Sequence, residues 1–476
     1  MHRVLSVLLL LAGVGQAATI RVPGDQRTIQ AGIDTAVDGD RVLVAEGTYV
    51  EKLNFLGKAI KVIGAGPDKS VIDVSTASVG FARAVTFDRD EEASSVLYGF
   101  TLTGGYARNG GGLYCAASSP TIANCAVSGN RSKFDCGGVY CHGGSSPTLL
   151  NCAITGNSSA YNGGGIFCDG SSPTVTNCTI TANSSEDLGG GGVYCFKSSP
   201  ILTNCSISGN SALYAAGISC LSSAPILTDC AISDNTSISD AGGVNCYSYS
   251  TPTFTRCTIA NNSTHGAGGG INCTFFSSPK LMNCVISGNV SGQSGGGIFA
   301  RGGSSLELAN CTISGNSAMW YGGAIGCSEA DATFRNCTFT DNSAGWNSGT
   351  IHCFDSISTL TNCIVWGGMP TEIRGAGFSI TYCDVQGGYR GAGNLDADPN
   401  FRSYRGYAYV LAPDSPCIDS GTGDDDGVDW NSIHPRYGDF NSTLPDMGAY
   451  GGPGAAGWRT VGSGLIPPPT DHSSYR

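Results

Sequence analysis

Charged residues are scarce in this chain, and basic residues are scarcer than acidic ones. They make up 13% of the 476 residues, with 25 Lys and Arg against 37 Asp and Glu, which gives a formal net charge of -12. No stretch of the sequence gathers several Lys or Arg residues together. Nucleic-acid-binding proteins use such clusters to neutralise phosphates, so we expect no nucleic-acid partner.

Long hydrophobic runs are missing after the first residues of the chain. The one such run, Val4–Val14, follows Arg3 and precedes the small residues Gly15 and Ala17. This order is typical of a cleaved signal peptide. We therefore predict a signal peptide over residues 1–17 and a mature protein without a transmembrane segment. The mature protein is expected to be exported, either secreted or held at the cell surface.

The chain is rich in glycine, with 71 residues, and in one repeated unit. An Asn lies five residues after nine of the ten cysteines of the unit, from Asn130 to Asn342, and a Pro lies five residues before the first seven, from Pro120 to Pro279. These cysteines recur every 25 to 27 residues, at Cys125, Cys152, Cys178, Cys205, Cys230, Cys257, Cys284, Cys311, Cys337 and Cys363. A fixed period of this length is the signature of a solenoid.

Within one unit the hydrophobic period is two, as in a β-strand. Ile166 and Cys168 share one face, and Val175 shares a face with Cys178 and Ile180 around a corner at Asn177. Such short strands cannot close a core alone, but they can when each pairs in parallel with its counterpart in the next coil. We therefore predict an all-β parallel β-helix with regular coils over residues 105–393.

The two ends of the chain are expected to differ from the coils. Residues 18–104 are predicted to hold an N-terminal cap and irregular first coils. A short helix over residues 28–37 would turn Ile29, Ile33 and Val37 toward the first coil and cover it. An irregular C-terminal cap is predicted over residues 394–461, and a disordered tail over residues 462–476.

Short motifs make the resemblance to a known family specific. Gly322–Ile325 ("GGAI") and Phe339–Asn342 ("FTDN") match the paired motifs of polymorphic outer-membrane protein repeats. Residues 19–55 resemble the N-terminal start of secreted bacterial β-helix proteins, and residues 396–421 and 445–452 resemble their C-terminal end. The chain thus resembles the right-handed parallel β-helix of the pectin-lyase-like fold. This resemblance implies the fold and is compatible with outer-membrane association, but the fold hosts lyases, hydrolases, adhesins and inert scaffolds.

Nine of the 22 cysteines form a second repeated set, and each of them lies directly after a Gly-rich corner of the chain. Its members are Cys115, Cys141, Cys168, Cys195, Cys220, Cys246, Cys273, Cys327 and Cys353. Pairing within one coil would leave Cys311 alone, because Ala300 holds the matching position. Disulfides between neighbouring coils fit the Cα spacing but not the direction of the Cβ vectors. We favour reduced cysteines that act as small core residues, with systematic disulfides as the alternative.

Catalytic signals are weak. A lyase of this fold would need clustered carboxylates for calcium and a basic residue beside them, and no acidic cluster lies among the outward positions next to the second cysteine set. We therefore predict a surface or secreted scaffold for adhesion or glycan contact, with no catalytic site identified. A polysaccharide lyase or glycoside hydrolase of the same fold is the alternative. The sequence does not indicate the oligomeric state.

One acidic loop, "GTGDDDGVDWN" over residues 421–431, is a candidate calcium site. Clustered carboxylate oxygens are the ligands that calcium prefers, although the loop lacks the complete EF-hand spacing. A solvated loop without bound metal is the alternative interpretation. The candidate ligands are Asp424, Asp425, Asp426 and Asp429.

Aromatic residues recur at two positions of the unit. Four are predicted on the outer face of successive coils, at Tyr114, Tyr140, Phe167 and Tyr194. Five lie in the Gly-rich corner, at Phe134, Tyr161, Tyr214, Trp320 and Trp346. Stacked rings stabilise one another, and rings along a rod can also stack on the sugars of an extended glycan. The pattern favours the structural role and leaves a polysaccharide or cell-surface glycan as the predicted partner.

Overall fold

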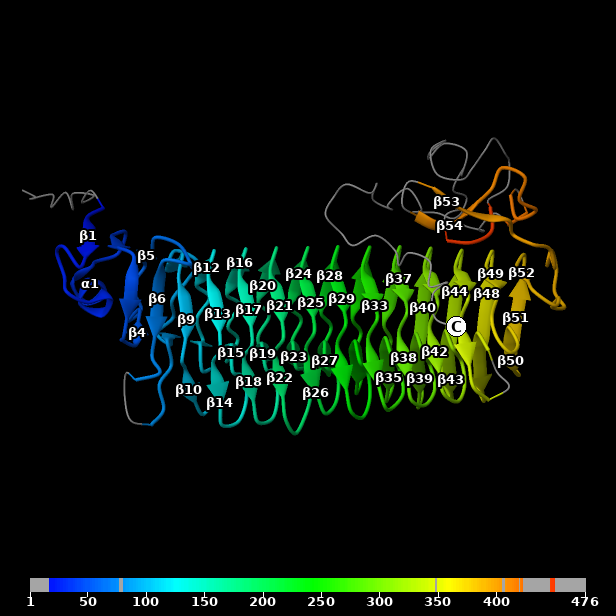
Figure 1. Cartoon of the computed structure of the whole chain (residues 1–476), viewed down its shortest axis with the longest axis horizontal. Helices are drawn as coiled ribbons and strands as arrows, with labels where there is room; N and C mark the ends of the chain where they lie inside the picture. Colours follow the sequence, from blue (N-terminus) through cyan, green and yellow to red (C-terminus); the bar gives the residue numbers. More distant parts are fainter. Residues whose placement is uncertain are drawn as a thin grey trace, which may run out of the picture.

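The computed structural model describes residues 17–76, 80–346, 349–404, 407–418, 420–422 and 446–449. Within these ranges the strands stack in parallel, coil upon coil, into a rod (Figure 1). Four sheets run along the rod, with 15 strands in sheet A, 14 in sheet B, 13 in sheet C and 10 in sheet D among the described residues. The predicted all-β parallel β-helix is confirmed.

Sheets C and D contain the strands on either side of the Gly-rich corner. In spatial order sheet C consists of β4 (Leu53–Asn54), β7 (Val85–Phe87), β11 (Leu113–Ala116), β15 (Val139–His142), β19 (Ile166–Asp169), β23 (Val193–Phe196), β27 (Ile218–Leu221), β31 (Val244–Tyr247), β35 (Ile271–Thr274), β39 (Ile298–Arg301), β43 (Ile325–Ser328), β47 (Ile351–Phe354) and β50 (Ile373–Gly375). Sheet D consists of β10 (Tyr106–Ala107), β14 (Arg131–Ser132), β18 (Ser158–Ser159), β22 (Ser184–Ser185), β26 (Ser211–Ala212), β30 (Thr236–Ser237), β34 (Ser263–Thr264), β38 (Val290–Ser291), β42 (Ser317–Ala318) and β46 (Ser343–Ala344).

Sheets A and B complete the coil. Sheet A consists of β1 (Thr19–Val22), β2 (Arg41–Val44), β5 (Lys61–Ile63), β8 (Val96–Tyr98), β12 (Thr121–Ala123), β16 (Thr148–Leu150), β20 (Thr174–Thr176), β24 (Ile201–Thr203), β28 (Ile226–Thr228), β32 (Thr253–Thr255), β36 (Lys280–Met282), β40 (Ser305–Ala309), β44 (Asp331–Arg335), β48 (Ser358–Thr361) and β51 (Phe378–Thr381). Sheet B consists of β3 (Gly47–Tyr49), β6 (Ser70–Asp73), β9 (Thr101–Thr103), β13 (Ala126–Ser128), β17 (Ala153–Thr155), β21 (Thr179–Thr181), β25 (Ser206–Ser208), β29 (Ala231–Ser233), β33 (Thr258–Ala260), β37 (Val285–Ser287), β41 (Thr312–Ser314), β45 (Thr338–Thr340), β49 (Ile364–Trp366) and β52 (Asp384–Val385).

The inward positions of the strands form one continuous core. Ile166 and Cys168 are buried, and along sheet C the second cysteine set pairs in register, interrupted at Ala300 as the sequence predicts. All 22 cysteines are buried free thiols. Burial raises the pKa of Cys115 and Cys337 because a thiolate would lose its hydration there. Twenty of the cysteines pack in this core, whereas Cys136 and Cys417 belong to smaller clusters. The cysteines thus occupy buried positions as predicted, and their reduced state stays a prediction.

Asparagine has two roles, and they fall on different residues of the unit. Asn177 turns the chain between sheets A and B with a left-handed φ of 54°. Asn183 belongs instead to a buried ladder, where its Nδ2 donates to the Ile154 carbonyl at 2.9 Å and to Asn210 Oδ1 at 3.1 Å. The left-handed residue of that second corner is Ala182, with a φ of 53°.

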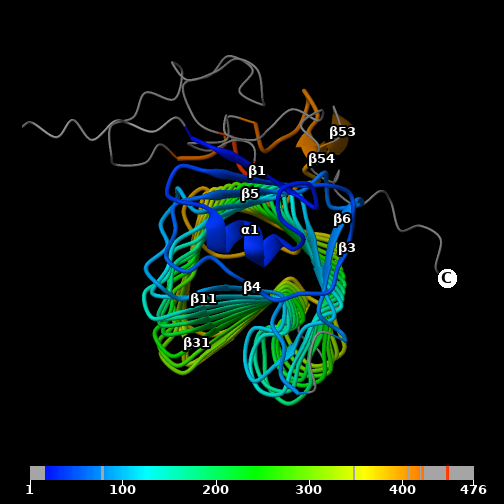
Figure 2. The same ribbon diagram turned by 90° about the vertical axis from the view of Figure 1, so that its left-hand side faces the viewer.

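The N-terminal helix α1 (Ile29–Thr35) lies across the first coil (Figure 2). Ile29 and Ile33 are fully buried, as predicted, whereas Val37 is 67% exposed. The prediction for Val37 is wrong because the helix ends before Ala36, whose extended backbone (φ -62°, ψ 148°) carries the chain away from the core. The described part of the chain contains no helix with the length and hydrophobicity of a membrane span.

The described part of the C-terminal region folds back beside the last coils. The hairpin of β53 (Phe401–Tyr404) and β54 (Tyr407–Leu411) lies there (Figure 1). Leu411, Cys417 and Met447 pack with Ile364 into a small second core. Ile364 points outward from β49, next to the inward Val365, so these residues cover the outer face of sheet B near its end.

Candidate functional site

The outer face of sheet C brings together a pocket and four of the predicted aromatic residues. Because side chains alternate along a strand, the residues between the buried Val, Ile, Leu and Cys positions point outward. From the N-terminal end these residues are Asn54, Thr86, Tyr114, Tyr140, Phe167 and Tyr194. They follow one another at ~4.8 Å from coil to coil.

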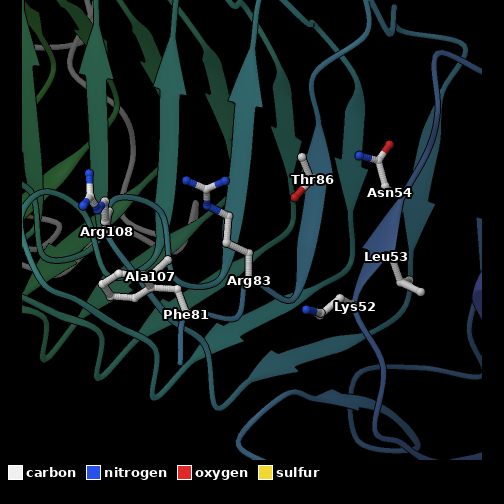
Figure 3. Close-up of a pocket in the computed structure, with 8 residues that line it drawn as sticks. All are labelled: Lys52, Leu53, Asn54, Phe81, Arg83, Thr86, Ala107 and Arg108. Carbon is white, nitrogen blue, oxygen red and sulfur yellow. The ribbon is translucent and has the colours of Figure 1, made fainter. Parts of the chain in front are cut away.

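A pocket of about 350 Å³ opens at the N-terminal end of this face (Figure 3). It is lined by Lys52, Leu53, Asn54, Phe81, Arg83, Thr86, Ala107 and Arg108. Leu53 and Ala107 are buried, whereas Lys52, Phe81 and Arg108 are exposed. The volume lies at the lower end of the range for ligand sites, about 300–1,000 Å³.

The pocket concentrates positive charge on a chain with a net charge of -12. Lys52, Arg83 and Arg108 line it, and among the described residues no ion pair joins them to a carboxylate. The Arg83 guanidinium carbon lies 4.0 Å from the ring centroid of Tyr114, and its Nε donates to the Asn109 carbonyl at 3.0 Å. Burial lowers the pKa of Arg83, although the group stays protonated. Such a site favours an anionic ligand.

The four rings predicted on this face contact one another in order. Ring centroids are 5.6 Å apart for Tyr114 and Tyr140, 5.3 Å for Tyr140 and Phe167, and 5.0 Å for Phe167 and Tyr194. Together with Cys136 they form a hydrophobic cluster outside the main core. Tyr140 and Phe167 are only 5% and 6% exposed, so they offer no free ring face in this structure. Glycan contact stays a prediction for the half-buried Tyr114 and Tyr194.

Of the rings predicted in the Gly-rich corner, Phe134 and Tyr161 contact each other, and Trp346 contacts Tyr321, a ring outside the predicted set. Phe134 and Tyr161 stack with centroids 6.0 Å apart and planes at 4°. The Phe134 N–H donates to the Arg108 carbonyl at 2.9 Å, which places this stack beside the pocket. Farther along the rod, Trp346 lies 6.4 Å from the ring of Tyr321. The exposed predicted rings are Tyr161 (39%), Tyr214 (41%), Trp320 (39%) and Trp346 (62%).

The structure also pairs His142 with Asp169, two residues that the sequence analysis did not single out. His142 Nδ1 lies 3.1 Å from Asp169 Oδ2, and the Tyr140 hydroxyl donates to the same oxygen at 3.0 Å. The His142 side chain is 50% exposed. A carboxylate that holds one ring nitrogen leaves the other to exchange protons with a ligand. Both residues directly follow a cysteine of the second set, and that shared position is the signal that could have revealed the pair.

The predicted calcium ligands Asp424, Asp425, Asp426 and Asp429 lie outside the described residues. Within the described ranges no three His, Cys, Asp or Glu side chains are grouped so that they could hold a metal ion. Calcium binding by the acidic loop therefore stays a prediction.

Comparison with known proteins identifies the repeat. A family model described as "Right handed beta helix region" matches residues 90–225, 165–324 and 216–385, which together cover more than half of the chain. No curated protein matches the chain in sequence.

Several solved structures have a similar fold at low sequence identity. One is a pectate lyase, with 13% identity over 92% of this chain and 97% of that chain and a TM-score of 0.35. Another is a mannuronic-acid-specific polysaccharide family 6 lyase from human gut microbiota, with 12% identity over 77% and 87% and a TM-score of 0.38. A third is a surface adhesin of Streptococcus pneumoniae, with 10% identity over 74% and 86% and a TM-score of 0.29. Similarity at this level carries no argument about function.

Proposed function

Because the chain belongs to the right-handed β-helix family, we propose that it is an exported scaffold that binds an acidic polysaccharide on the outer face of sheet C. The supporting observation is the pocket lined by Lys52, Arg83 and Arg108. These cations have no ion pair among the described residues, on a chain with a net charge of -12. The carboxylate of Asp88 acts on Arg83 electrostatically without forming an ion pair with it. The excess of cations in the lining of this concave site still favours a ligand with negative charges.

The chemistry of the pocket suits a sugar acid. An Arg guanidinium binds a carboxylate or a sulfate through two parallel hydrogen bonds. The hydroxyl of Thr86 lines the same pocket and can meet a sugar hydroxyl. The Asn54 amide is already engaged, since its Nδ2 donates to Asp88 Oδ1 at 3.1 Å and its Oδ1 accepts from the Leu56 N–H at 2.8 Å. The ring of Phe81, 45% exposed, offers an apolar surface for the C–H face of a sugar. A polymer would extend from this pocket along the repeated face of the rod.

The test is binding to polygalacturonate and alginate, measured by isothermal titration calorimetry. The double variant Arg83→Ala, Arg108→Ala should bind at least about tenfold more weakly, because each lost charge-assisted hydrogen bond is worth about 1.5–3 kcal/mol. Its affinity should also depend less on salt than that of the wild type. Arg335→Ala, which removes an exposed arginine from sheet A, is the matched control. Equal binding by all three proteins would show that the pocket is not the site.

The His142–Asp169 pair favours a second candidate function, acid–base catalysis on the bound polysaccharide. Two strand steps of sheet C separate β15 from β7, so His142 lies ~10 Å along the rod from the pocket. The protein would be incubated with a panel of polysaccharides, with and without calcium, and assayed for new reducing ends or unsaturated products. Repeated turnover that His142→Ala abolishes would replace the scaffold with a lyase or hydrolase. Absence of products across the panel would support the scaffold.

Export rests on the N-terminal sequence alone. The apolar run Val4–Val14 behind Arg3 supports cleavage after residue 17 and secretion or display at the cell surface. Mass spectrometry of the protein from the medium and the surface fraction should find a mature chain that begins near Ala18. An intact N-terminus in the cytosolic fraction alone would overturn export.

A further inference from the structure

Four exposed aromatic rings lie in the corner between sheets C and A of two adjacent coils. Tyr247 ends β31, Tyr249 follows it, and Phe275 and Phe276 follow β35. Their exposed fractions are 42%, 67%, 49% and 55% in that order. Centroids are 5.0 Å apart for Tyr247 and Phe275, and 5.4 Å apart for Tyr249 and Phe276, whose planes differ by 12°. We call these four residues the corner rings.

Three of the corner rings lie on a backbone that glycine adopts more easily. The φ value is 61° at Tyr249, 54° at Phe275 and 59° at Phe276. The equivalent corners after β15 and β39 are Gly143–Gly144 and Gly302–Gly303, also with positive φ values. A side chain in the left-handed region crowds the backbone and costs free energy, and glycine avoids this cost. Stability alone would therefore favour glycine at these three positions.

The rings thus combine backbone strain with exposure to solvent. Contact between the rings offsets part of the strain, but it does not explain why two other corners with two consecutive left-handed residues, after β15 and β39, use glycine instead. Strained non-glycine residues concentrate where a protein holds a ligand. We propose that the corner rings bind a carbohydrate by stacking on its sugar rings.

The exposed area of the corner rings fits a short stretch of polysaccharide. Their exposed fractions amount to roughly 400 Å² for side chains that bury about 150–250 Å² each. A protein partner in a stable complex covers about 800 Å² on each side. A sugar ring has an apolar C–H face and a rim of hydroxyls, which matches flat rings bordered by polar groups. Asn245 is half-buried and lies two residues before Tyr247 on the same outer face. Its amide can hydrogen-bond to the hydroxyls of such a sugar.

The corner rings and the cationic pocket are separate surfaces. Six strand steps of sheet C lie between β7 and β31, which corresponds to ~29 Å along the rod. The corner rings carry no charge, so the ligand class that they select is an uncharged polysaccharide. The inference rests on the proposed function in that the ligand is again a polysaccharide, but it does not depend on the pocket.

The test replaces the strained rings with the residue that the backbone prefers. The triple variant Tyr249→Gly, Phe275→Gly, Phe276→Gly should melt at the same temperature as the wild type or higher. It should bind uncharged polysaccharides such as β-glucan, xylan and galactomannan at least tenfold more weakly in affinity electrophoresis. Phe354→Ala is the matched control, because Phe354 is 60% exposed and ends β47 as Tyr247 ends β31. This control should bind like the wild type.

Running the pocket variant Arg83→Ala, Arg108→Ala beside the triple variant separates the two proposals. Loss of uncharged glycan binding in the triple variant alone supports the corner rings, whatever happens to acidic glycans. Wild-type protein that binds acidic but no uncharged polysaccharide would overturn this inference and leave the pocket proposal standing. A lower melting temperature of the triple variant would also overturn it, since the rings would then be structural. Self-association lost in the triple variant, measured by sedimentation, would identify a second copy as the occupant and overturn it as well.

Discussion

Replacing Asn183 should destabilise the protein far more than replacing Asn177, although both lie in the same coil. Asn183 is fully buried. Its Nδ2 donates to the Ile154 carbonyl at 2.9 Å and to Asn210 Oδ1 at 3.1 Å, and its Oδ1 accepts from the backbone N–H and the Nδ2 of Asn157, both at 3.0 Å. Asn183→Ala removes four hydrogen bonds and leaves the Asn157 N–H buried without an acceptor.

The magnitude follows from these contacts. At about 1 kcal/mol net for each hydrogen bond, with a further penalty for the stranded donor, Asn183→Ala should lower the free energy of unfolding by about 3–5 kcal/mol. Asn177 is exposed, and its side chain exchanges single hydrogen bonds with Asn151 and Asn204. Its φ of 54° suits glycine, so Asn177→Gly should change stability by less than about 1 kcal/mol.

Guanidinium unfolding followed by circular dichroism measures the difference. Stacked coils need not unfold in two states, so hydrogen exchange with mass spectrometry should accompany it. Asn183→Ala should speed exchange in peptides that cover residues 150–160 and 176–186, whereas Asn177→Gly should not. If both variants shift the midpoint equally, the buried ladder contributes no more to stability than the exposed corner, and the reasoning from hydrogen-bond satisfaction fails.

Four further predictions concern the register of the coils, the thiols, one buried carboxyl group and the acidic loop. Inserting one residue within 174–180 would turn Cys178 and Ile180 to the wrong face of the strand and should cause aggregation. Deleting residues 205–229, which form one full coil, should instead leave a soluble rod with a β-type circular dichroism spectrum. Thiol counting should find most of the 22 cysteines free after denaturation without reductant and few reactive in the native protein, since all are buried; a count near zero after denaturation would establish disulfides. Burial raises the pKa of Glu372, so the stability that this group contributes is present at acid pH and is lost as the pH rises through its folded pKa. Glu372→Gln should therefore raise the melting temperature more at pH 7 than at pH 4. An equal change at both pH values would contradict this reasoning. Millimolar calcium should raise the melting temperature if the acidic loop over residues 421–431 binds it, and no shift would leave a solvated loop.

The fold was predictable because its information is local and repeated. Side chains alternate between two faces at Ile166 and Cys168, the chain turns at Asn177, and the same sequence pattern recurs every 25 to 27 residues. Few structures other than parallel, in-register coils satisfy all three features. Even the interruption of the cysteine column at Ala300 was visible in the sequence. The end of the N-terminal helix was predicted less well, as Val37 shows, because the last turn of a helix depends on contacts that the hydrophobic pattern does not encode.

The composition and period of the sequence determined the solenoid, its inward cysteines and the recurrence of asparagine at one position of the unit. Only the tertiary structure decided which aromatic rings are accessible, since Tyr140 and Phe167 are covered while the corner rings stand exposed. It also assembled the cations of the pocket, which come from three different coils, and it paired His142 with Asp169 across two strands. The physical reason is that a repeat specifies the contacts of each residue with its counterpart in the next coil. The corners between the sheets vary in sequence from coil to coil, and the side chains that they place on the outer face decide burial and charge partners there.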